Sequence, residues 1–225
     1  MLRVELTNKD WDPIRKSGMK KSTEYYALYF PNKDTGTYAN ICGMPSLKRF
    51  TICFWMKSSA SNIGTPFSYN VAGGDNELLI YNYGDYSLWI RKKERKVHGS
   101  ANDGRWHHIC FTWRSHDGAV RFYKDGRLRT HDLNGLKKGY TIKGGGSLVL
   151  GGEQDSLGGR FQSYQSFQGY LTNVNVWSYV LPSTTIRKLS KSCLAGNGNV
   201  YKWNDFIYGV KGKTAIVMPS PCYPK

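Results

Sequence analysis

The sequence predicts an all-β fold in which two antiparallel sheets pack face to face. Residues typical of strands and turns are abundant, with 25 Gly, 16 Tyr and 7 Trp among 225 residues. Short alternating runs recur along the chain, whereas long helical periodicities are scarce. The length and the 40% hydrophobic content suit one sizeable domain with its own core.

The predicted strands are short and are separated by turn residues. In one of them Phe50, Ile52 and Phe54 share one face while Cys53 lies on the other, because side chains alternate along a strand. Asp-Gly at 125–126 supplies the positive φ that a tight hairpin turn requires. In chain order we expect strands at 24–30, 37–41, 50–57, 78–81, 86–90, 106–113, 120–123, 127–130, 147–150, 169–177 and 199–203.

One short helix is expected near residues 183–191. Pro182 and Ser183 open it, and the Ser183 hydroxyl is the predicted N-cap. Ile186 and Leu189 then share a face that would pack on a sheet.

The two ends of the chain differ in character. Residues 1–22 are polar and basic, and we expect them to form an arm without an assigned role, followed by a single domain at 23–225. The arm lacks the apolar segment of a signal peptide, and no apolar run is long enough to span a membrane. If the protein is secreted, this sequence is a mature chain or a fragment.

The chain is strongly basic, with 32 Lys and Arg against 16 Asp and Glu and a net charge of +16. Such an excess favours polyanions, for example sulfated or phosphorylated polysaccharides, lipopolysaccharide or phospholipid headgroups. Any single cluster is better explained as a solvated surface, whereas the summed charge favours a function. The clusters lie at 15–16, 20–21, 91–96, 137–138 and 187–191.

The stretch 151–165, which follows a strand-like run, concentrates oxygen ligands. Glu153 and Asp155 point the same way in extended backbone and repel unless a cation or proton lies between them. Gln162 and Gln165 add amide oxygens. Calcium prefers such oxygen ligands, so the stretch predicts a calcium site. A polar turn with solvated carboxylates explains the same residues equally well, because the pattern is not that of an EF-hand.

Several motifs resemble the pentraxin family, whose members include C-reactive protein and serum amyloid P component. The segment 108–115 is similar to the family signature His-x-Cys-x-Ser/Thr-Trp-x-Ser, and the similarity runs in one register from about Thr23 to Trp203. It implies a flattened jelly roll of the legume-lectin type. The motifs are GDNELLIY (74–81), HHICFTW (107–113), LVLGGEQDSLGGRF (148–161) and QSFQGYLTNVNVW (165–177).

The resemblance also implies a pair of calcium ions. The first would be held by Asp75, Asn76, Glu153, the backbone carbonyl of Gln154, and Asp155; the second by Glu153, Asp155, Gln162 and Gln165. Many members carry an acidic residue where Gln162 stands. Because an amide oxygen is a weaker calcium ligand than a carboxylate, the second ion should bind more weakly.

A ligand pocket beside the ions is implied in the same way. Tyr81 and Trp89 correspond to its apolar or aromatic walls, and Glu94 to an acidic residue that contacts choline. An aromatic face attracts a quaternary ammonium and also stacks on a sugar ring. Both aromatic residues would otherwise belong to the core.

Taken together, the resemblance predicts a secreted, calcium-dependent, lectin-like protein of innate immunity. Its ligands would be phosphocholine, anionic glycans or lipopolysaccharide. It would form a cyclic homo-oligomer, usually a pentamer, with all calcium sites on one face. It would bind no specific nucleic acid and contact membranes only through headgroups.

Five cysteines fit an oxidising compartment. By the resemblance, Cys53 and Cys110 form the bridge within the domain, and Cys193 and Cys222 a tail bridge found in invertebrate members and in pentraxin modules of larger receptors. Cys42 is left over. It would be a free thiol, a bond between subunits or a buried cysteine.

Two other functions stay open, and enzymatic activity is not expected. The chain could be an adhesion module of a larger receptor, or a calcium-independent polyanion binder. His107 and His108 are adjacent on a strand and point to opposite faces, so they do not share a metal easily. Glu153 and Asp155 could form a glycosidase pair, but nothing in the sequence separates their pKa values and the family supplies no catalytic precedent.

Overall fold

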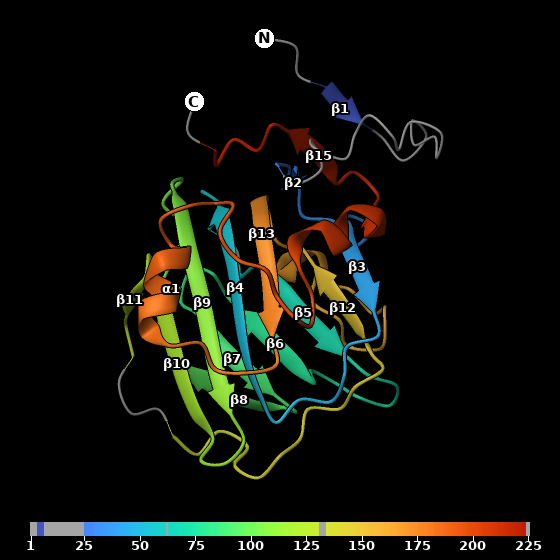
Figure 1. The fold of residues 1–225 in the computed structure, drawn as a ribbon. Coiled ribbons are helices and arrows are strands. Elements are labelled where there is room, and N and C mark those ends of the chain that lie inside the picture. The colour runs from blue at the N-terminus through green and yellow to red at the C-terminus, as the bar shows by residue number, and fades with distance from the viewer. Residues whose placement is uncertain (1–3, 7–24, 62, 131–133, 224–225) are drawn as a thin grey trace.

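The structure is a sandwich of two antiparallel sheets (Figure 1). This computed structural model describes residues 4–6, 25–61, 63–130 and 134–223. The eight-stranded sheet has the order β1-β15-β2-β13-β4-β9-β10-β11, and the seven-stranded sheet has the order β14-β3-β12-β5-β6-β7-β8. The predicted all-β jelly-roll sandwich is therefore confirmed.

The strands are short apart from three long ones, β4, β9 and β13, at the centre of the eight-stranded sheet. The bounds are β1 Val4–Leu6, β2 Ala27–Phe30, β3 Tyr38–Cys42, β4 Arg49–Lys57, β5 Phe67–Asn70, β6 Leu78–Tyr81, β7 Ser87–Ile90, β8 Lys93–Lys96, β9 Trp106–Arg114, β10 Ala119–Lys124, β11 Arg127–Leu128, β12 Ser147–Leu150, β13 Gly169–Trp177, β14 Val210–Lys211 and β15 Ala215–Met218. The helix α1 spans Ser183–Leu189, and short 3₁₀ helices occupy Ser163–Gln165 (η2) and Trp203–Gly209 (η3).

The main core lies between the two sheets and is rich in aromatic side chains. Phe50 and Phe54 of β4 point into it, as the alternation predicted, and meet Phe67 and Ile80 of the opposite sheet within one buried cluster. Burial of large apolar side chains of this kind contributes about 1.5–3 kcal/mol each.

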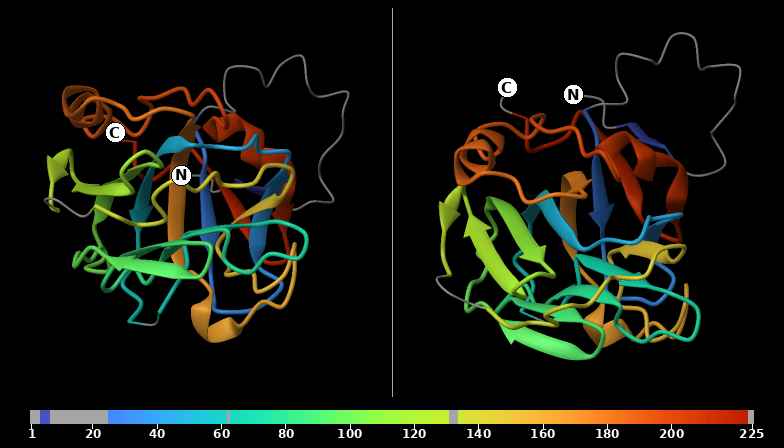
Figure 2. Two further views of the ribbon diagram at one scale, coloured as in Figure 1. Left: turned by 90° about the horizontal axis from the view of Figure 1, so that it is seen from below. Right: turned by 60° about the horizontal axis from the view of Figure 1, so that its bottom comes forward.

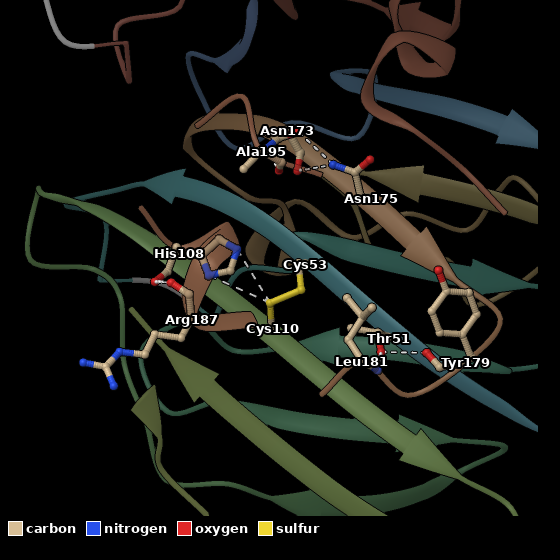
Figure 3. The surroundings of a disulfide bond; sticks show 11 residues. Thr51, Cys53, His108, Cys110, Asn173, Asn175, Tyr179, Leu181, Arg187 and Ala195 are labelled. Atoms are coloured by element: carbon tan, nitrogen blue, oxygen red, sulfur yellow. Dashed lines mark hydrogen bonds between the residues drawn. A yellow bond between two sulfur atoms is a disulfide. The ribbon is translucent and has the colours of Figure 1, made fainter. Parts of the chain in front are cut away.

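A second, smaller core lies on the outer face of the eight-stranded sheet, under α1. Ile186 and Leu189 of α1 pack there, and Cys53 and Cys110 lie beneath them (Figure 3). The predicted helix is confirmed, but its predicted cap is wrong. Pro182 is the N-cap residue, and the Ser183 hydroxyl instead hydrogen-bonds to the Tyr123 hydroxyl at 2.9 Å.

The C-terminal part differs from the prediction. Residues 199–203 do not form a strand: Tyr201 alone pairs with Val176, and the chain then turns into η3. The strands β5, β8, β14 and β15 were not predicted. Residues 4–6 of the predicted arm pair with β15 as an edge strand, and residues 7–22 lie outside the described residues.

Both predicted disulfides are present, Cys53–Cys110 and Cys193–Cys222. The Cys53–Cys110 bridge joins directly opposed residues of β4 and β9. Cys42 is a free, exposed cysteine, so the alternative of a buried thiol is wrong. Within the described residues, no helix is long and apolar enough to cross a membrane.

Candidate functional site

The loop that follows β12 is attached to the outer face of the seven-stranded sheet. Its anchor is Gln154, whose buried side chain donates hydrogen bonds to the carbonyls of Ser68 (2.9 Å) and Ser147 (3.0 Å). Gln154 also accepts a bond from the backbone N–H of Gly158 at 2.9 Å, which closes the turn. The side-chain amide of Gln154 therefore holds the loop in place. Its backbone carbonyl accepts a hydrogen bond from the Asn70 amide at 3.1 Å, and a second lone pair of that oxygen remains for a cation.

Anchoring the loop buries oxygen atoms that have no hydrogen-bond partner. Among the described residues, 11 buried side-chain nitrogen or oxygen atoms lack a partner, and five of them belong to this site. They are both carboxylate oxygens of Glu153, Oδ1 of Asp75, Oδ1 of Asn76 and Oε1 of Gln165. Native proteins rarely leave such groups unpaired, because each costs about 1–3 kcal/mol.

Glu153 is the centre of this group, with a relative exposure of 1%. Burial, together with the nearby carboxylates of Asp155 and Asp75, raises the pKa of Glu153 to about 7, while the Asn76 side chain acts in the opposite direction. Without a cation, a charged Glu153 is therefore unfavourable. The atoms that surround it are oxygens, which are the ligands that calcium prefers.

The predicted partners of the second ion lie beside Glu153 in the loop. The amide nitrogen of Gln162 donates a hydrogen bond to Asp155 Oδ2 at 2.8 Å. Gln165 lies at the end of η2, with its amide nitrogen 3.5 Å from the hydroxyl of Tyr81. All seven predicted ligand residues therefore belong to one region, formed by the segment before β6 and the loop after β12.

One residue of this region has no signal in the sequence. The Lys92 ammonium lies 2.9 Å from Asp75 Oδ2 and forms an ion pair with it, in the turn between β7 and β8. Lys92 is 17 positions away from Asp75, and only the pairing of β6 with β7 brings the two side chains together. A protein cation therefore already occupies one side of the acidic group.

The neighbouring acid Glu77 has a different role. Its side chain is fully buried and accepts hydrogen bonds from the Tyr140 hydroxyl and the Lys143 backbone N–H, both at 2.8 Å, with Arg91 3.9 Å away. Although it follows Asp75 and Asn76 directly, Glu77 therefore stabilises the segment 140–143 through its hydrogen bonds.

The predicted pocket residues form a continuous strip on the same outer face. Trp89 lies directly opposite Glu94 across β7 and β8, and its ring is 6.5 Å from that of Tyr81 in an edge-to-face arrangement. Tyr81 and Trp89 are half-buried and Glu94 is exposed. Since the inward-facing neighbours on these strands fill the core, both aromatic residues lie outside it, beside Gln165.

The described residues contain only one group of three His, Cys, Asp or Glu ligand atoms within 4.8 Å of one another: Cys53, His108 and Cys110. The two sulfurs are bonded to each other, so they are not free to bind a metal. Burial lowers the pKa of His108 to about 4, which keeps its ring neutral above the disulfide (Figure 3). The carboxylates around Glu153 do not form such a group. A cation in that site would therefore need amide and carbonyl oxygens as well.

The site and α1 lie on opposite faces of the sandwich. Figure 2 shows the orange coil of η2 at the bottom of both views and α1 near the top. Gln154 lies against outward-facing Ser68 of the seven-stranded sheet, whereas α1 packs on the eight-stranded sheet.

Comparison with solved structures supports the architecture. The crystal structure of a native heptameric SAP-like pentraxin from Limulus polyphemus has a TM-score of 0.78 at 24% identity and covers 89% of this chain and 98% of that chain. The full extracellular region of zebrafish Gpr126/Adgrg6 has a TM-score of 0.67 at 21% identity, over 86% of this chain and 26% of that one. At these identities the likeness shows the fold alone.

Relatives found by sequence are more similar to this chain than these solved structures are. Sushi, von Willebrand factor type A, EGF and pentraxin domain-containing protein 1 of Rattus norvegicus is 43% identical over 178 residues, which are 77% of this chain and 5% of that protein. Neuronal pentraxin-2 of Cavia porcellus is 40% identical over 189 residues, or 82% of this chain and 44% of that protein. This chain thus spans less than half the length of either relative.

The Pentaxin family model matches residues 26–219, which is nearly the whole described domain. Members of this family are binding proteins, typically secreted or extracellular. The match, the relatives and the two-sheet fold agree with one another, and the chain belongs to the pentraxin family.

Proposed function

We propose that this chain is a calcium-dependent recognition module that binds anionic or phosphorylated ligands on the outer face of the seven-stranded sheet. The observation that carries the proposal is the group of five buried, unpartnered oxygen atoms around Glu153. A pair of hard cations that bind oxygen would satisfy all of them.

The residues fit calcium in number and kind. Asp75, Asn76, Glu153, the Gln154 carbonyl and Asp155 would hold the first ion, and Glu153, Asp155, Gln162 and Gln165 the second. Three carboxylates supply a charge of −3 against +4 from two ions. The loaded site is then positive by about one charge from these groups alone, and its open coordination positions would accept an anionic oxygen of the ligand.

The aromatic strip defines the remaining part of the ligand. Tyr81 and Trp89 offer an edge-to-face pair beside Gln165, and Glu94 adds a carboxylate next to Trp89. A quaternary ammonium near an aromatic face gains about 0.5–2 kcal/mol. Phosphocholine would therefore bind with its phosphate at the ions and its choline group on the aromatic strip. Anionic glycans and lipopolysaccharide would fit by an acidic group at the ions and a sugar ring on the strip.

We further infer that the chain is secreted and forms a ring. The two disulfides are typical of an oxidising compartment, and weak sites gain avidity when several act together. A cyclic oligomer with all sites on one face, five being the usual number in the family, provides this. The Limulus protein is described as a heptamer, so the ring size must be measured.

A second candidate role is that of a pentraxin module within a larger receptor or adhesion protein. The observation that favours it is the 43% identity to a multidomain protein of which the matched region is only 5%. In that role calcium would be structural. Light scattering at micromolar concentration with calcium distinguishes the two, since a monomer favours the module and a ring favours the recognition protein.

The experiment that tests the proposed function is ligand capture with and without calcium. Immobilised phosphocholine and an array of anionic glycans and lipopolysaccharide should retain the protein in calcium and release it in chelator. Calorimetric titration should give calcium affinities of roughly 10⁻⁴–10⁻³ M, as in other extracellular modules. Capture that ignores the chelator would contradict the proposal.

A further inference from the structure

A cleft of about 550 Å³ lies between the β10–β11 turn and α1, on the face opposite the loop after β12. Its walls carry three basic side chains: Arg127 from the turn side, Arg187 from α1, and Lys191 just beyond α1. The hydroxyls of Ser183 and Thr184 also line it. The cleft therefore combines cations and hydroxyls from two separate elements.

Two contacts fix the walls of the cleft. At one end the Tyr123 hydroxyl bonds to the Ser183 hydroxyl at 2.9 Å. At the other, a Cβ on Gly126 would lie 2.3 Å from Ser190 Oγ and 3.1 Å from the Cα of Arg187, so only glycine allows this approach. Below, the small core around the Cys53–Cys110 bridge holds α1 on the sheet. The cleft is therefore formed before any ligand arrives.

The positive charges of the cleft are not neutralised by the protein. No ion pair joins Arg127, Arg187 or Lys191 to a carboxylate within the described part of the chain. All three are exposed, and the Arg187 side chain extends away from the disulfide (Figure 3). Exposed cations in a preformed concave site attract anions more strongly than scattered ones.

The only acid in the lining, Asp125, is already engaged. Its oxygens accept hydrogen bonds from His107 Nδ1 at 2.8 Å and from the His108 backbone N–H at 3.0 Å. His107 also lies 2.9 Å from Asp103, which in turn pairs with Arg105 at 2.8 Å. Asp125 is therefore held by these partners, and its single negative charge leaves the three cleft cations in excess.

We propose that this cleft is a calcium-independent site for a sulfated polysaccharide. Guanidinium groups bind tetrahedral oxyanions through paired hydrogen bonds, and the serine and threonine hydroxyls complement sugar hydroxyls. The volume lies within the range of small-ligand sites and suits a short stretch of sugar units. A nucleic acid is disfavoured because the one aromatic side chain in the lining, Tyr123, is 1% exposed and offers no stacking surface.

The test is binding of a size-defined heparin oligosaccharide to the whole chain in chelator, measured by calorimetry over a range of salt concentrations. We compare Arg187→Gln with Lys191→Gln against a matched control, Lys93→Gln with Lys96→Gln, which removes the same charge from exposed positions of β8. The cleft variant should lose roughly tenfold in affinity at low salt, and the slope of its salt dependence should fall by about two units. The control should change affinity by less than about twofold.

A second variant, Thr184→Glu, places a carboxylate in the cleft without removing a contact that the structure shows, and it should weaken binding by a similar factor. Unchanged unfolding midpoints confirm that both variants fold. Equal losses in the cleft and control variants would overturn the proposal, because binding would then follow the overall charge of +16. Tighter binding of single-stranded DNA that is lost in the same variants would overturn the assignment to polysaccharide.

Discussion

Two glutamates beside the seven-stranded sheet, Glu77 before β6 and Glu153 in the loop after β12, are equally buried but differ in their hydrogen-bond partners. Glu77, at 0% exposure, receives hydrogen bonds from Tyr140 and Lys143 and lies near Arg91. Glu153, at 1% exposure, has no partner for either oxygen. Burial of a carboxylate is tolerated when the protein supplies donors, and otherwise requires a proton or a cation from outside. The difference separates a structural acid from a candidate ligand.

The largest expected effect is on Glu77. Replacing it by Gln keeps its shape but removes the charge that attracts Arg91 and weakens the bonds from Tyr140 and Lys143. We expect a loss of about 2–4 kcal/mol in the free energy of unfolding, equal in calcium and in chelator. Urea unfolding measures this. Glu94→Gln, at an exposed position, is the control and should change stability by less than about 0.5 kcal/mol.

A second expected effect concerns the weaker ion. Gln162→Glu adds a carboxylate beside Asp155 and should tighten the second calcium by about tenfold while leaving the first unchanged. Calorimetric titration resolves the two steps if their affinities differ. Ser163→Glu places the same charge one residue away on η2 and serves as the control. If both variants act alike, the local field and not direct ligation explains the effect.

A smaller effect is expected from Lys92. Its ammonium already neutralises part of Asp75, so Lys92→Gln should tighten the first calcium by about two- to fivefold, a modest gain because the ion pair is exposed to solvent. Lys93→Gln removes a neighbouring charge with no ion pair among the described residues and should have less effect. Calcium affinity unchanged by Lys92→Gln would mean that the Lys92–Asp75 pair does not compete with the ion.

The sequence predicted the fold well where burial creates a pattern. β4 alternates Phe50, Ile52 and Phe54 into the main core against Cys53 on the other side, and both faces are covered. β8 has the sequence Lys-Glu-Arg-Lys and is an edge strand that buries little, so it has no apolar alternation to detect. The apolar residues at 199–203 support η3 and one bridge instead of a strand, because a short apolar run does not specify its own conformation.

Prediction of the candidate site from the sequence had the same limit, because contacts between distant residues leave no local pattern. The residues of the site were predicted from the loop composition and the family resemblance, but neither shows that Glu77 has hydrogen-bond partners and that Glu153 has none. Lys92 enters the site only through strand pairing, which places residues distant in sequence side by side. The hydrogen bonds of Gln154 to Ser68 and Ser147, which position the loop, also depend on tertiary structure. Which buried polar atoms have a hydrogen-bond partner is therefore visible only in the folded structure.

The most direct measurement of the central claim is a comparison of the free energy of unfolding of wild type and Glu153→Gln, each in chelator and in about 10 mM calcium. In chelator the variant should be as stable as wild type or more stable, because it no longer buries an unpartnered carboxylate. In calcium, wild type should gain about 1–3 kcal/mol and the variant almost nothing. A variant that gains as much from calcium as wild type, or that is destabilised equally in both conditions, would contradict a cation site at Glu153.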